Sequence, residues 1–411
     1  MSDSRPSLPV VSRQPDTDIV EFPVYYVRGG TSTGLIIDDA IAPADIALRE
    51  ELLRHLMGVP LTGTQKGNTQ TTGLGRGPAT SNKVFFVSTE TVDGQVRLVS
   101  TLAQLASQHA SIDWSVNCGN MSSALPLWAL AQGLAADDGG NFEIDIRNTN
   151  TGVISTARVL RDEVGRLVNA EIPGVAGAFP AVDLFLHHPV GSKTGKLLPT
   201  GMATDLINGV DVSCVDAAVP MVILDAAQLG KTAYEAPRDL EADAAFMARI
   251  RDIWSEAGLR MQLRRVDGEL MTREDLAASE TMPKVCIIGK AAQGGNLSVR
   301  YFTPQTAHAS MAVSGACCLA VASLIPGTVA HRIATNVAQP GSDFGESTVV
   351  IENPAGLLEA TAVAKYDGTD LVVSKVGYRR NAQLLMRGSV PLYRASEALR
   401  EALLNGTCLA S

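Results

Sequence analysis

The sequence predicts an α+β fold made of two similar β-rich, barrel-like halves, each wrapped round one central helix. Glycine supplies 37 of the 411 residues and aromatic residues only 5%, which favours short strands joined by many turns. Two helical stretches, 117–131 and 308–322, are unusually apolar, occupy comparable places in the two halves, and contain a small-residue turn near their start. Helices that are apolar on nearly every face are buried. We therefore expect both helix N-termini to face a cleft between the halves.

The first half is expected to form a domain over 21–190, after a flexible N-terminal tail of residues 1–20 that is polar and rich in proline and serine. A helix is predicted over 44–58, because its leucines recur at helical spacing. A hairpin is predicted over 83–100, because an Asp-Gly turn signal separates its two apolar runs. Further strands are predicted at 22–28, 34–38, 142–149, 153–159 and 167–172.

The second half is expected to form a domain over 191–411, with packing of its last segment back onto the first domain left as an option. An amphipathic helix is predicted over 242–259, an apolar helix over 314–324 and a final helix over 395–404. Strands are predicted at 219–225, 284–290, 296–303, 347–353, 357–366, 371–380 and 382–388.

Charge and composition exclude several classes of partner. The net charge of −9 argues against nucleic acids and anionic membranes, although a pocket whose local field opposes the global one still accepts a small anion. No stretch approaches 18 consecutive apolar residues, so no transmembrane helix is predicted. The N-terminus lacks the apolar segment of a signal peptide, and we expect a cytoplasmic protein. The oligomeric state is left open, with a homodimer as one option.

Neither a metal nor a cofactor is expected. Six cysteines without a CxxC pair are too few for a disulfide framework, which indicates a reducing compartment. The six histidines show no metal-ligand spacing. The loop GSKTGKLLPTG at 191–201 lacks the Walker pattern, because Leu197 follows Lys196 where serine or threonine is required. Its hydroxyls, amides and lysines suit a carboxylate better than a nucleotide.

Cys118 is the most distinctive candidate for reactivity. It stands in the run Asn-Cys-Gly-Asn at 117–120, at or beside a predicted helix start, where the helix dipole lowers the pKa of a thiol. The residues leave two interpretations open, a reactive thiol or the small buried hydrophobe that free cysteines most often are. The turns at 117–120 and 314–316 likewise suit either carboxylate binding or ordinary helix starts.

Lys83 opens the predicted strand KVFFV, directly after a glycine-rich loop. A lysine at such a junction is commonly a solvated strand end. Alternatively it is a base in a cleft, with a pKa lowered by burial or by a neighbouring cation such as Arg76. The residues alone do not decide between the two.

Six motifs in this chain resemble those of the PrpF family, whose members are similar in fold to diaminopimelate epimerase. They run in the family's order and are VRGGTSTG (27–34), GLGRGPATSNKV (73–84), NCGNMSSALPLWALAQGL (117–134), GSKTGKLLPTG (191–201), VDAAVPMVILDAAQLG (215–230) and HASMAVSGACCLAVASLIPGTV (308–329). The family includes isomerases and tautomerases of 2-methylaconitate, 3-methylitaconate, aconitate and 4-oxalomesaconate. The resemblance implies a diaminopimelate epimerase-like fold with its active site between pseudo-symmetric domains. It also implies cofactor-independent proton transfer on a small anionic polycarboxylate.

The resemblance also implies a catalytic pair. The family's catalytic cysteine lies in Asn-Cys-Gly-Asn and its catalytic lysine in Thr-Ser-Lys-Val, which places these roles on Cys118 and Lys83. This chain departs from the family pattern at Asn82, which separates Ser81 from Lys83, and at Thr33, where members commonly carry a cation. A one-residue shift on a strand changes the face that a side chain occupies, so Asn82 raises the question of where Lys83 points.

The family match suggests which groups hold the substrate. Arg76 is a candidate replacement for the cation missing at position 33. The other candidates are Arg28, Thr31, Ser32, Asn117, Gly119, Asn120, Ser192, Thr194, His308, Ser310, Ser314 and Gly315. We expect an allylic 1,3-proton shift or a cis–trans isomerisation through a dienolate. Lys83 is favoured as the base and Cys118 as the acid, with the direction left open.

Two other functions stay open at this stage. One is an amino-acid racemase or epimerase with two catalytic cysteines, which would pair Cys118 with Cys317 or Cys318. Few acidic partners for a substrate amino group accompany the motifs, which argues against it. The other is a non-catalytic carboxylate-binding protein on the same scaffold, with its base misplaced by Asn82.

Overall fold

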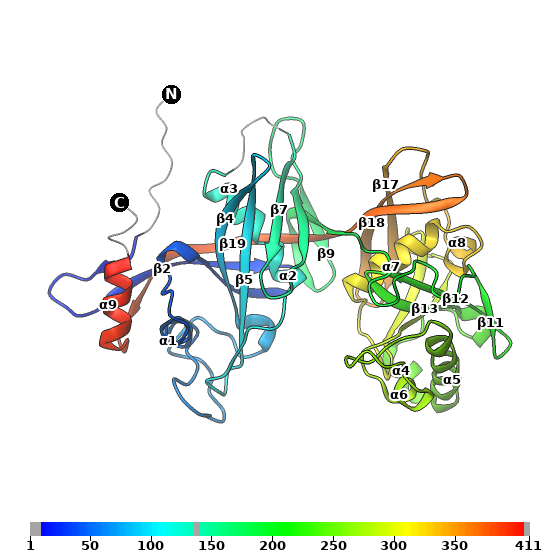
Figure 1. Cartoon of the computed structure of the whole chain (residues 1–411), viewed down its shortest axis with the longest axis horizontal. Helices are drawn as coiled ribbons and strands as arrows, with labels where there is room; N and C mark the ends of the chain where they lie inside the picture. The colour runs from blue at the N-terminus through cyan, green and yellow to red at the C-terminus, as the bar shows by residue number, and fades with distance from the viewer. Residues whose placement is uncertain (1–9, 135–139, 407–411) are drawn as a thin grey trace. The chain divides into compact units, whose positions relative to one another are not determined.

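The computed structural model describes residues 10–134 and 140–406 (Figure 1). The chain divides into two compact units. The first unit holds the described residues up to Glu171, the segment Val175–Leu184 and those from Arg380 onward. The second unit holds Ile172–Gly174 and Phe185–Arg379. The last described residues therefore return to the first unit.

In the first unit, the main strands follow one another with pairings that are antiparallel, parallel, antiparallel, parallel and antiparallel. In order they are β2 (Val20–Gly29), β3 (Ser32–Asp38), β4 (Lys83–Val92), β5 (Gln95–Leu105), β7 (Phe142–Asn148) and β8 (Ile154–Val159). The two-residue strands β1 (Ser12–Arg13) and β6 (Ile112–Asp113) add to β2 and β5. A parallel pair needs a crossover, and the crossovers between β3 and β4 and between β5 and β7 each contain helices.

The second unit repeats the same order of pairings. Its strands are β12 (Val210–Ala217), β13 (Val219–Asp225), β14 (Lys284–Gly289), β15 (Leu297–Thr303), β17 (Gly345–Asn353) and β18 (Gly356–Asp367). The two-residue strand β16 (Thr306–Ala307) adds to β15 as β6 adds to β5, and a helix follows each. The halves are therefore topological repeats of each other.

The remaining strands include β19 (Asp370–Leu392), which belongs to both units. Its early residues pair with β18 up to Tyr378, and its later residues pair with β2 from Ala382. The prediction of two separate strands at 371–380 and 382–388 was therefore wrong, because no turn interrupts the run. The other strands are β9 (Asn169–Ile172), β10 (Val175–His187) and β11 (Asp205–Ile207).

Helices α1 (Ile46–Met57) and α9 (Glu397–Gly406) cover one face of the first unit's sheet. Their leucines share a buried cluster with alternate strand residues such as Tyr26, Leu35 and Val84. Successive side chains on a strand point to opposite faces. The strand residues that alternate with this buried set therefore point to the other face of the sheet, where α2 contacts β2 and β3.

The apolar helix expected over 117–131 is divided into α2 (Gly119–Ser122) and α3 (Leu125–Ala131). Pro126 lies in the first turn of α3, where a proline N–H is not needed. The hydroxyls of Ser122 and Ser123 bond to the carbonyls of Cys118 and Asn120, and such bonds compete with regular helix bonding. Its counterpart α7 (Val313–Leu324) is continuous and almost wholly buried.

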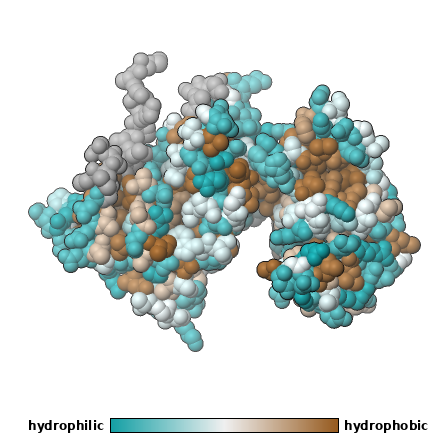
Figure 2. Space-filling model, viewed as in Figure 1, coloured by the Kyte–Doolittle hydropathy of each residue, from teal (hydrophilic) through white to brown (hydrophobic). Residues whose placement is uncertain are grey.

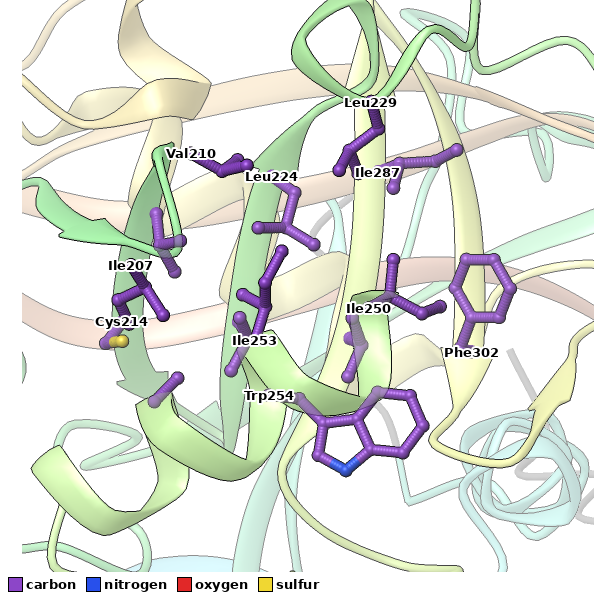
Figure 3. Packing of buried hydrophobic residues seen from close by; sticks show 14 of the residues in the cluster. Ile207, Val210, Cys214, Leu224, Leu229, Ile250, Ile253, Trp254, Ile287 and Phe302 are labelled. Carbon is purple, nitrogen blue, oxygen red and sulfur yellow. The ribbon is translucent and has the colours of Figure 1, made fainter. Parts of the chain in front are cut away.

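The core of the second unit lies between α5 (Ala244–Arg260) and strands β12 to β15. Figure 3 shows Ile250, Ile253 and Trp254 of α5 packed against residues of these strands. The sequence did not predict the short helices α4 (Pro237–Ala242), α6 (Arg273–Ala278) and α8 (Val329–Ile333). The Thr272–Asp275 capping box before α6 was a readable signal for one of them. Short 3-10 helices cover Asp39–Ile41, Ala79–Ser81 and Ala226–Leu229.

Apolar side chains reach the surface in groups separated by hydrophilic residues, as Figure 2 shows. Leu384, Leu385 and Met386, at the irregularity where β19 pairs with β2, are exposed apolar residues. Exposed apolar residues of this kind are common in folded proteins. Among the described residues, no helix has both the length and the hydrophobicity that a bilayer span requires.

Candidate active site

Lys83 is the first residue of β4, where it pairs with Gly34 of β3 and Gln104 of β5. Its strand neighbours Val84 and Phe86 belong to the core beneath α1. By alternation Lys83 points to the opposite face, the face that carries α2. Only 5% of the lysine is exposed. Despite the intervening Asn82, Lys83 lies on the same side of the sheet as the Cys118 turn.

Cys118 occupies the N-cap position of α2 and is half-buried. Its Sγ accepts a hydrogen bond from the Met121 N–H at 3.5 Å and lies 3.8 Å from Oγ of Ser32. Ser32 is 1% exposed, so its hydroxyl is held against the sulfur with little competition from solvent. The cysteine therefore has two neighbours able to donate to a thiolate.

Asn117 and Gly119 flank the cysteine and shape its turn. Asn117 is exposed, and its side-chain oxygen accepts from the Cys118 N–H at 2.7 Å. Gly119 is the first residue of α2, which is only four residues long. A helix this short contributes little macrodipole, so the nearby donors, the Ser32 hydroxyl and the Met121 N–H, matter more to the sulfur than the helix dipole does.

Lys83 and Cys118 are close enough to interact electrostatically. Burial lowers the pKa of Lys83 below its usual 10.5, and negative charge on Cys118 opposes this decrease. The neutral amine is the form that accepts a proton, and a lowered pKa makes more of it available near neutral pH. The arrangement places a candidate base beside a candidate acid at one end of the first unit's sheet.

Two glycines let the β2–β3 turn approach the Cys118 turn closely. A Cβ on Gly29 would collide with the Asn120 carbonyl oxygen and lie 2.9 Å from Cα of Met121. Gly30 has a φ of +53°, and a Cβ there would collide with the side-chain oxygen of Asn120. The glycine pair of the motif VRGGTSTG therefore has a packing role beside the cysteine.

Asn120 joins three segments round the cysteine, a role that sequence reasoning missed in part. Its Nδ2 donates to Oγ1 of Thr31 at 3.2 Å. Its Oδ1 accepts from Nε of Arg380 at 2.9 Å. Arg380 lies on β19, more than 250 residues away in the chain, and is only 8% exposed. No local pattern connects Arg380 to the Cys118 turn, and only the return of β19 to the first unit brings it there.

Asn82, the residue that interrupts the family pattern, forms a buried amide pair with Gln70. Gln70 Nε2 donates to Asn82 Oδ1 at 2.7 Å, and Asn82 Nδ2 donates back to Gln70 Oε1 at 3.1 Å. Further bonds tie the pair to the Met57 carbonyl at the end of α1 and to the backbone of Gly77. Asn82 thus anchors the glycine-rich loop and leaves Lys83 to begin the strand.

Three polar side chains near these motifs lie on the other face of the sheet. Arg28 pairs in register with Thr33, which shares the strand face of Leu35 in the core beneath α1. The Arg28 guanidinium donates to Gln383 and Asn381 and lies over the Phe179 ring. Arg76 is exposed and lies over the ring of Tyr26. The structure does not bring Arg28, Thr33 or Arg76 into the cluster around Cys118.

In the second unit, Ser192 and Thr194 hold the buried carboxylate of Asp216. Ser192 Oγ donates to Asp216 Oδ1 at 2.6 Å, and Thr194 donates to Oδ2 from both its hydroxyl and its N–H. The N–H of Lys193 adds another bond to the same oxygen. These donors stabilise the loop internally, so the carboxylate they bind is the protein's own.

His308, Ser310, Ser314 and Gly315 gather at the start of α7. The Ser310 N–H donates to Nδ1 of His308 at 2.9 Å, and Ser310 Oγ donates to Asn353 at 3.1 Å. Ser314 and Gly315 lie in the first turn of α7, whose N-cap Ala312 provides no side-chain cap. The first-turn N–H groups of α7 therefore lack a side-chain acceptor.

Cys317 and Cys318 lie deeper in α7 and are fully buried. Cys317 Sγ donates to the Gly377 carbonyl, and Cys318 Sγ donates to the Val215 carbonyl. Burial raises the pKa of Cys318 far above its usual value. Within the described parts of the chain, His, Cys, Asp and Glu side chains form no group of three suited to a metal ion.

A family model described as "PrpF protein" matches residues 19–393 of this chain. The 4-oxalomesaconate tautomerase of Pseudomonas putida is 32% identical over 375 residues, which cover 90% of this chain and 96% of that protein. The (4E)-oxalomesaconate Delta-isomerase of Novosphingobium sp. is 33% identical over 377 residues, covering 91% and 98%.

Among solved structures, a methylitaconate-delta-isomerase is similar with a TM-score of 0.77 at 23% identity, covering 93% of this chain and 98% of that one. This similarity supports the mixed, strand-rich α/β fold described above.

Proposed function

Since the chain belongs to the PrpF family and is an isomerase, we propose that it moves a double bond in an unsaturated di- or tricarboxylate by a 1,3-proton shift. The observation that carries the proposal is the placement of Lys83 beside Cys118. The substrate class is supported by the relatives named for oxalomesaconate. Rotation within the same dienolate intermediate leads to cis–trans isomerisation as a second outcome.

In the first step, the neutral amine of Lys83 removes a proton from the sp³ carbon between the double bond and a carboxylate. The electron pair of the broken C–H bond delocalises over the double bond and the carboxylate as a dienolate. Cys118 then donates its thiol proton to the far carbon of the allylic system, which completes the shift. Fixed donors near the developing negative charge lower the barrier more than flexible ones do.

One turnover leaves an ammonium on Lys83 and a thiolate on Cys118. Loss of a proton from the ammonium and gain of a proton by the thiolate, with both groups exchanging with solvent, restore the starting pair and bring solvent hydrogen into the product. The Ser32 hydroxyl and the Met121 N–H, next to the sulfur, stabilise the transient thiolate. The close electrostatic interaction between Lys83 and Cys118 supports this reset.

Each unit offers candidate groups for binding a carboxylate of the substrate. From the first unit, Thr31 and Asn120 are the best-placed candidates, because they bond to each other next to the cysteine. From the second unit, Ser314 and Gly315 are the best placed, because the N–H groups of their helix turn lack a side-chain cap.

The positions and the burial of Cys317 and Cys318 in the second unit argue against a two-cysteine racemase. The position on α7 that corresponds to Cys118 on α2 is the N-cap, and alanine stands there. Cys317 and Cys318 lie beyond it, buried and bonded to backbone carbonyls. A buried thiol with a raised pKa is a poor proton-transfer group at neutral pH.

The test is uptake of solvent deuterium, followed by NMR, into cis-aconitate, trans-aconitate, 2-methylaconitate, methylitaconate and 4-oxalomesaconate. We expect exchange and isomerisation of at least one of them. Lys83→Ala and Cys118→Ser should each lower the rate by about 10²-fold or more, the range typical of lost general acid–base catalysis.

Lys66→Ala is the matched control, because Lys66 is an exposed lysine of the same unit. It should exchange deuterium at the wild-type rate. Near-normal exchange by Cys118→Ser would contradict the acid–base assignment. Binding of these acids without any exchange would instead identify a carboxylate-binding protein.

A further inference from the structure

Two neighbouring residues of β19, Arg380 and Asn381, contact the two turns that surround the candidate acid. Arg380 Nε donates to Oδ1 of Asn120, the last residue of the cysteine turn (residues 117–120), at 2.9 Å. The Asn381 carbonyl accepts from the N–H of Gly30, in the turn between β2 and β3, at 2.9 Å. All of these residues belong to the first unit. One short part of β19 therefore holds both sides of the site.

The backbone that carries Arg380 is held firmly in place. The side chain of Asn381 is fully buried. Its Nδ2 donates to the Ala170 carbonyl at 2.7 Å, and its Oδ1 accepts from Arg28 at 2.7 Å. Arg380 itself is only 8% exposed. Its guanidinium therefore reaches Asn120 from a fixed position, with little freedom to move away.

The contact with Arg380 fixes the orientation of the Asn120 amide. A guanidinium carries N–H donors and no acceptor, so only the oxygen of that amide can face it favourably. The NH₂ group must then point the other way, where Nδ2 donates to Oγ1 of Thr31 at 3.2 Å. If the amide turned over, donor would face donor, and a buried N–H of Arg380 would lose its acceptor at a considerable cost.

The NH₂ group of Asn120 lies where a ligand can reach it. Thr31 is exposed, and Asn120 is half-buried. Within residues 10–134 and 140–406, the hydroxyl of Thr31 is the one acceptor that this NH₂ group meets, which leaves its second hydrogen for a ligand. A donor at this place attracts a carboxylate oxygen, whereas the amide oxygen would repel it. The orientation of one amide thus decides whether the place favours an anion.

We propose that Arg380 is a positioning residue, which fixes the amide of Asn120 so that its NH₂ group donates to a substrate carboxylate beside Cys118. This inference rests on the proposed function and specifies how one carboxylate of the substrate is recognised. Arg380 acts through Asn120, from 260 residues further along the chain, and does not contact the substrate. The inference concerns binding, so it is testable without turnover.

The experiment measures binding of tricarballylate, a saturated tricarboxylate that cannot isomerise, by isothermal titration calorimetry. Wild-type protein should bind it. Arg380→Met should weaken binding by about tenfold, the loss expected when a hydrogen bond to a charged group is no longer made. Arg380→Lys should restore most of the affinity, because an ammonium is also a donor without an acceptor.

A double-mutant cycle separates action through Asn120 from a direct or a purely structural role. Asn120→Ala removes the amide and should itself weaken binding by about tenfold. Adding Arg380→Met to Asn120→Ala should then cost less than about a further twofold, because the group that Arg380 orients is already gone. Losses that multiply in the double variant would overturn the inference.

Asn120→Asp tests the same idea with Arg380 left in place. Aspartate has the shape of asparagine and still accepts from Arg380, but it replaces the NH₂ group with an oxygen. It should weaken tricarballylate binding by about tenfold or more, since an acceptor then faces the carboxylate. Binding at the wild-type level by this variant would contradict the proposal even if Arg380→Met failed to fold.

Arg387→Met is the matched control, because Arg387 is an exposed arginine of the same strand. It should bind tricarballylate as the wild type does. Unchanged binding in Arg380→Met, or no binding by the wild type, would also overturn the inference. Deuterium exchange is scored separately, so the expected cycle without any exchange by the wild type would support Arg380 while contradicting the proposed isomerisation.

Discussion

At the scale of single residues, burying Lys83 for its function lowers the stability of the folded protein. Its amine is nearly buried, and burial lowers its pKa from the value that it has in the unfolded chain. Between the folded and unfolded pKa values the unfolded chain binds more protons, so folding stability rises with pH there. Below the folded pKa the full penalty for burying the ammonium applies.

Replacing Lys83 with methionine should therefore stabilise the protein while abolishing activity. The free energy of unfolding at pH 7 should rise, and the advantage over the wild type should shrink as the pH increases toward 10.5, the lysine's usual value. Urea denaturation of both proteins across this pH range measures it. A variant less stable than the wild type at pH 7 would mean that the ammonium is well compensated in the fold.

The sequence identified most of the residues that gather round Cys118, because they lie in short motifs whose order is visible. Lys83, Ser32, Thr31 and Asn120 all fall within those motifs. The contribution of Arg380 was invisible, because its contact depends on a strand that returns from the far end of the chain. The side taken by Arg28 depends on strand register, and that of Arg76 depends on how its loop folds over Tyr26, and composition reveals neither.

The roles of polar side chains in two other motifs could not be predicted from the sequence, for a related physical reason. Ser192 and Thr194 look available for a ligand, but the carboxylate of Asp216 lies more than 20 residues further along the chain and uses both hydroxyls. Asn82 looked disruptive, yet its buried partner Gln70 lies 12 residues earlier. In both cases the deciding partner lies outside the motif, more than ten residues away in the chain.

At the scale of secondary-structure elements, the approach of the β2–β3 turn to α2 depends on glycine. Gly29→Ala should destabilise the protein by about 1–3 kcal/mol, the usual cost of overpacking, because the new methyl group meets the backbone of Asn120 and Met121. Making room for this methyl group displaces the turn that carries Cys118. Deuterium exchange should therefore fall by more than the loss of folded protein explains.

Gly388→Ala is the control for that prediction. Gly388 lies on β19 in the same sheet, and a Cβ there meets no atom within 4 Å. Chemical denaturation and exchange rates should both stay near wild-type values. Equal losses in the two variants would show that the sheet, and not the approach to the cysteine turn, is sensitive to added methyl groups.

The elements themselves were largely predictable, because alternating and helical patterns are local. The hairpin of β4 and β5 and the helices α1, α5 and α7 lie where the apolar spacing placed them. The division of the first central helix was not predicted, although Pro126 and the serine pair before it were visible. The continuity of β19 was missed, since pairing with different partners at its two ends is not a local property.

At the scale of the whole molecule, the first unit depends on the last part of the chain. The side chain of Leu399 on α9 is fully buried in the cluster that also holds the leucines of α1. Leu399→Ala should cost about 2–5 kcal/mol, as for other large-to-small core changes. Hydrogen exchange should accelerate in β2 to β5 and change little in β12 to β15.

Tyr393→Ala provides the comparison, because Tyr393 is 73% exposed and lies just before the same helix. Its exchange pattern should match that of the wild type. Equal acceleration in both units of Leu399→Ala would contradict independent stability and show that the two units unfold together.

The return of β19 and α9 to the first unit also affects the order in which the protein matures on the ribosome. Multidomain chains generally fold from the N-terminus as they are synthesised. Here the second unit is complete once Arg379 has emerged, whereas β2 must wait for the residues from Ala382 onward to pair with it. The half that carries Lys83 and Cys118 is translated first but completed last. Until then β2 lacks that partner strand, and an unpaired strand edge is open to association with other chains.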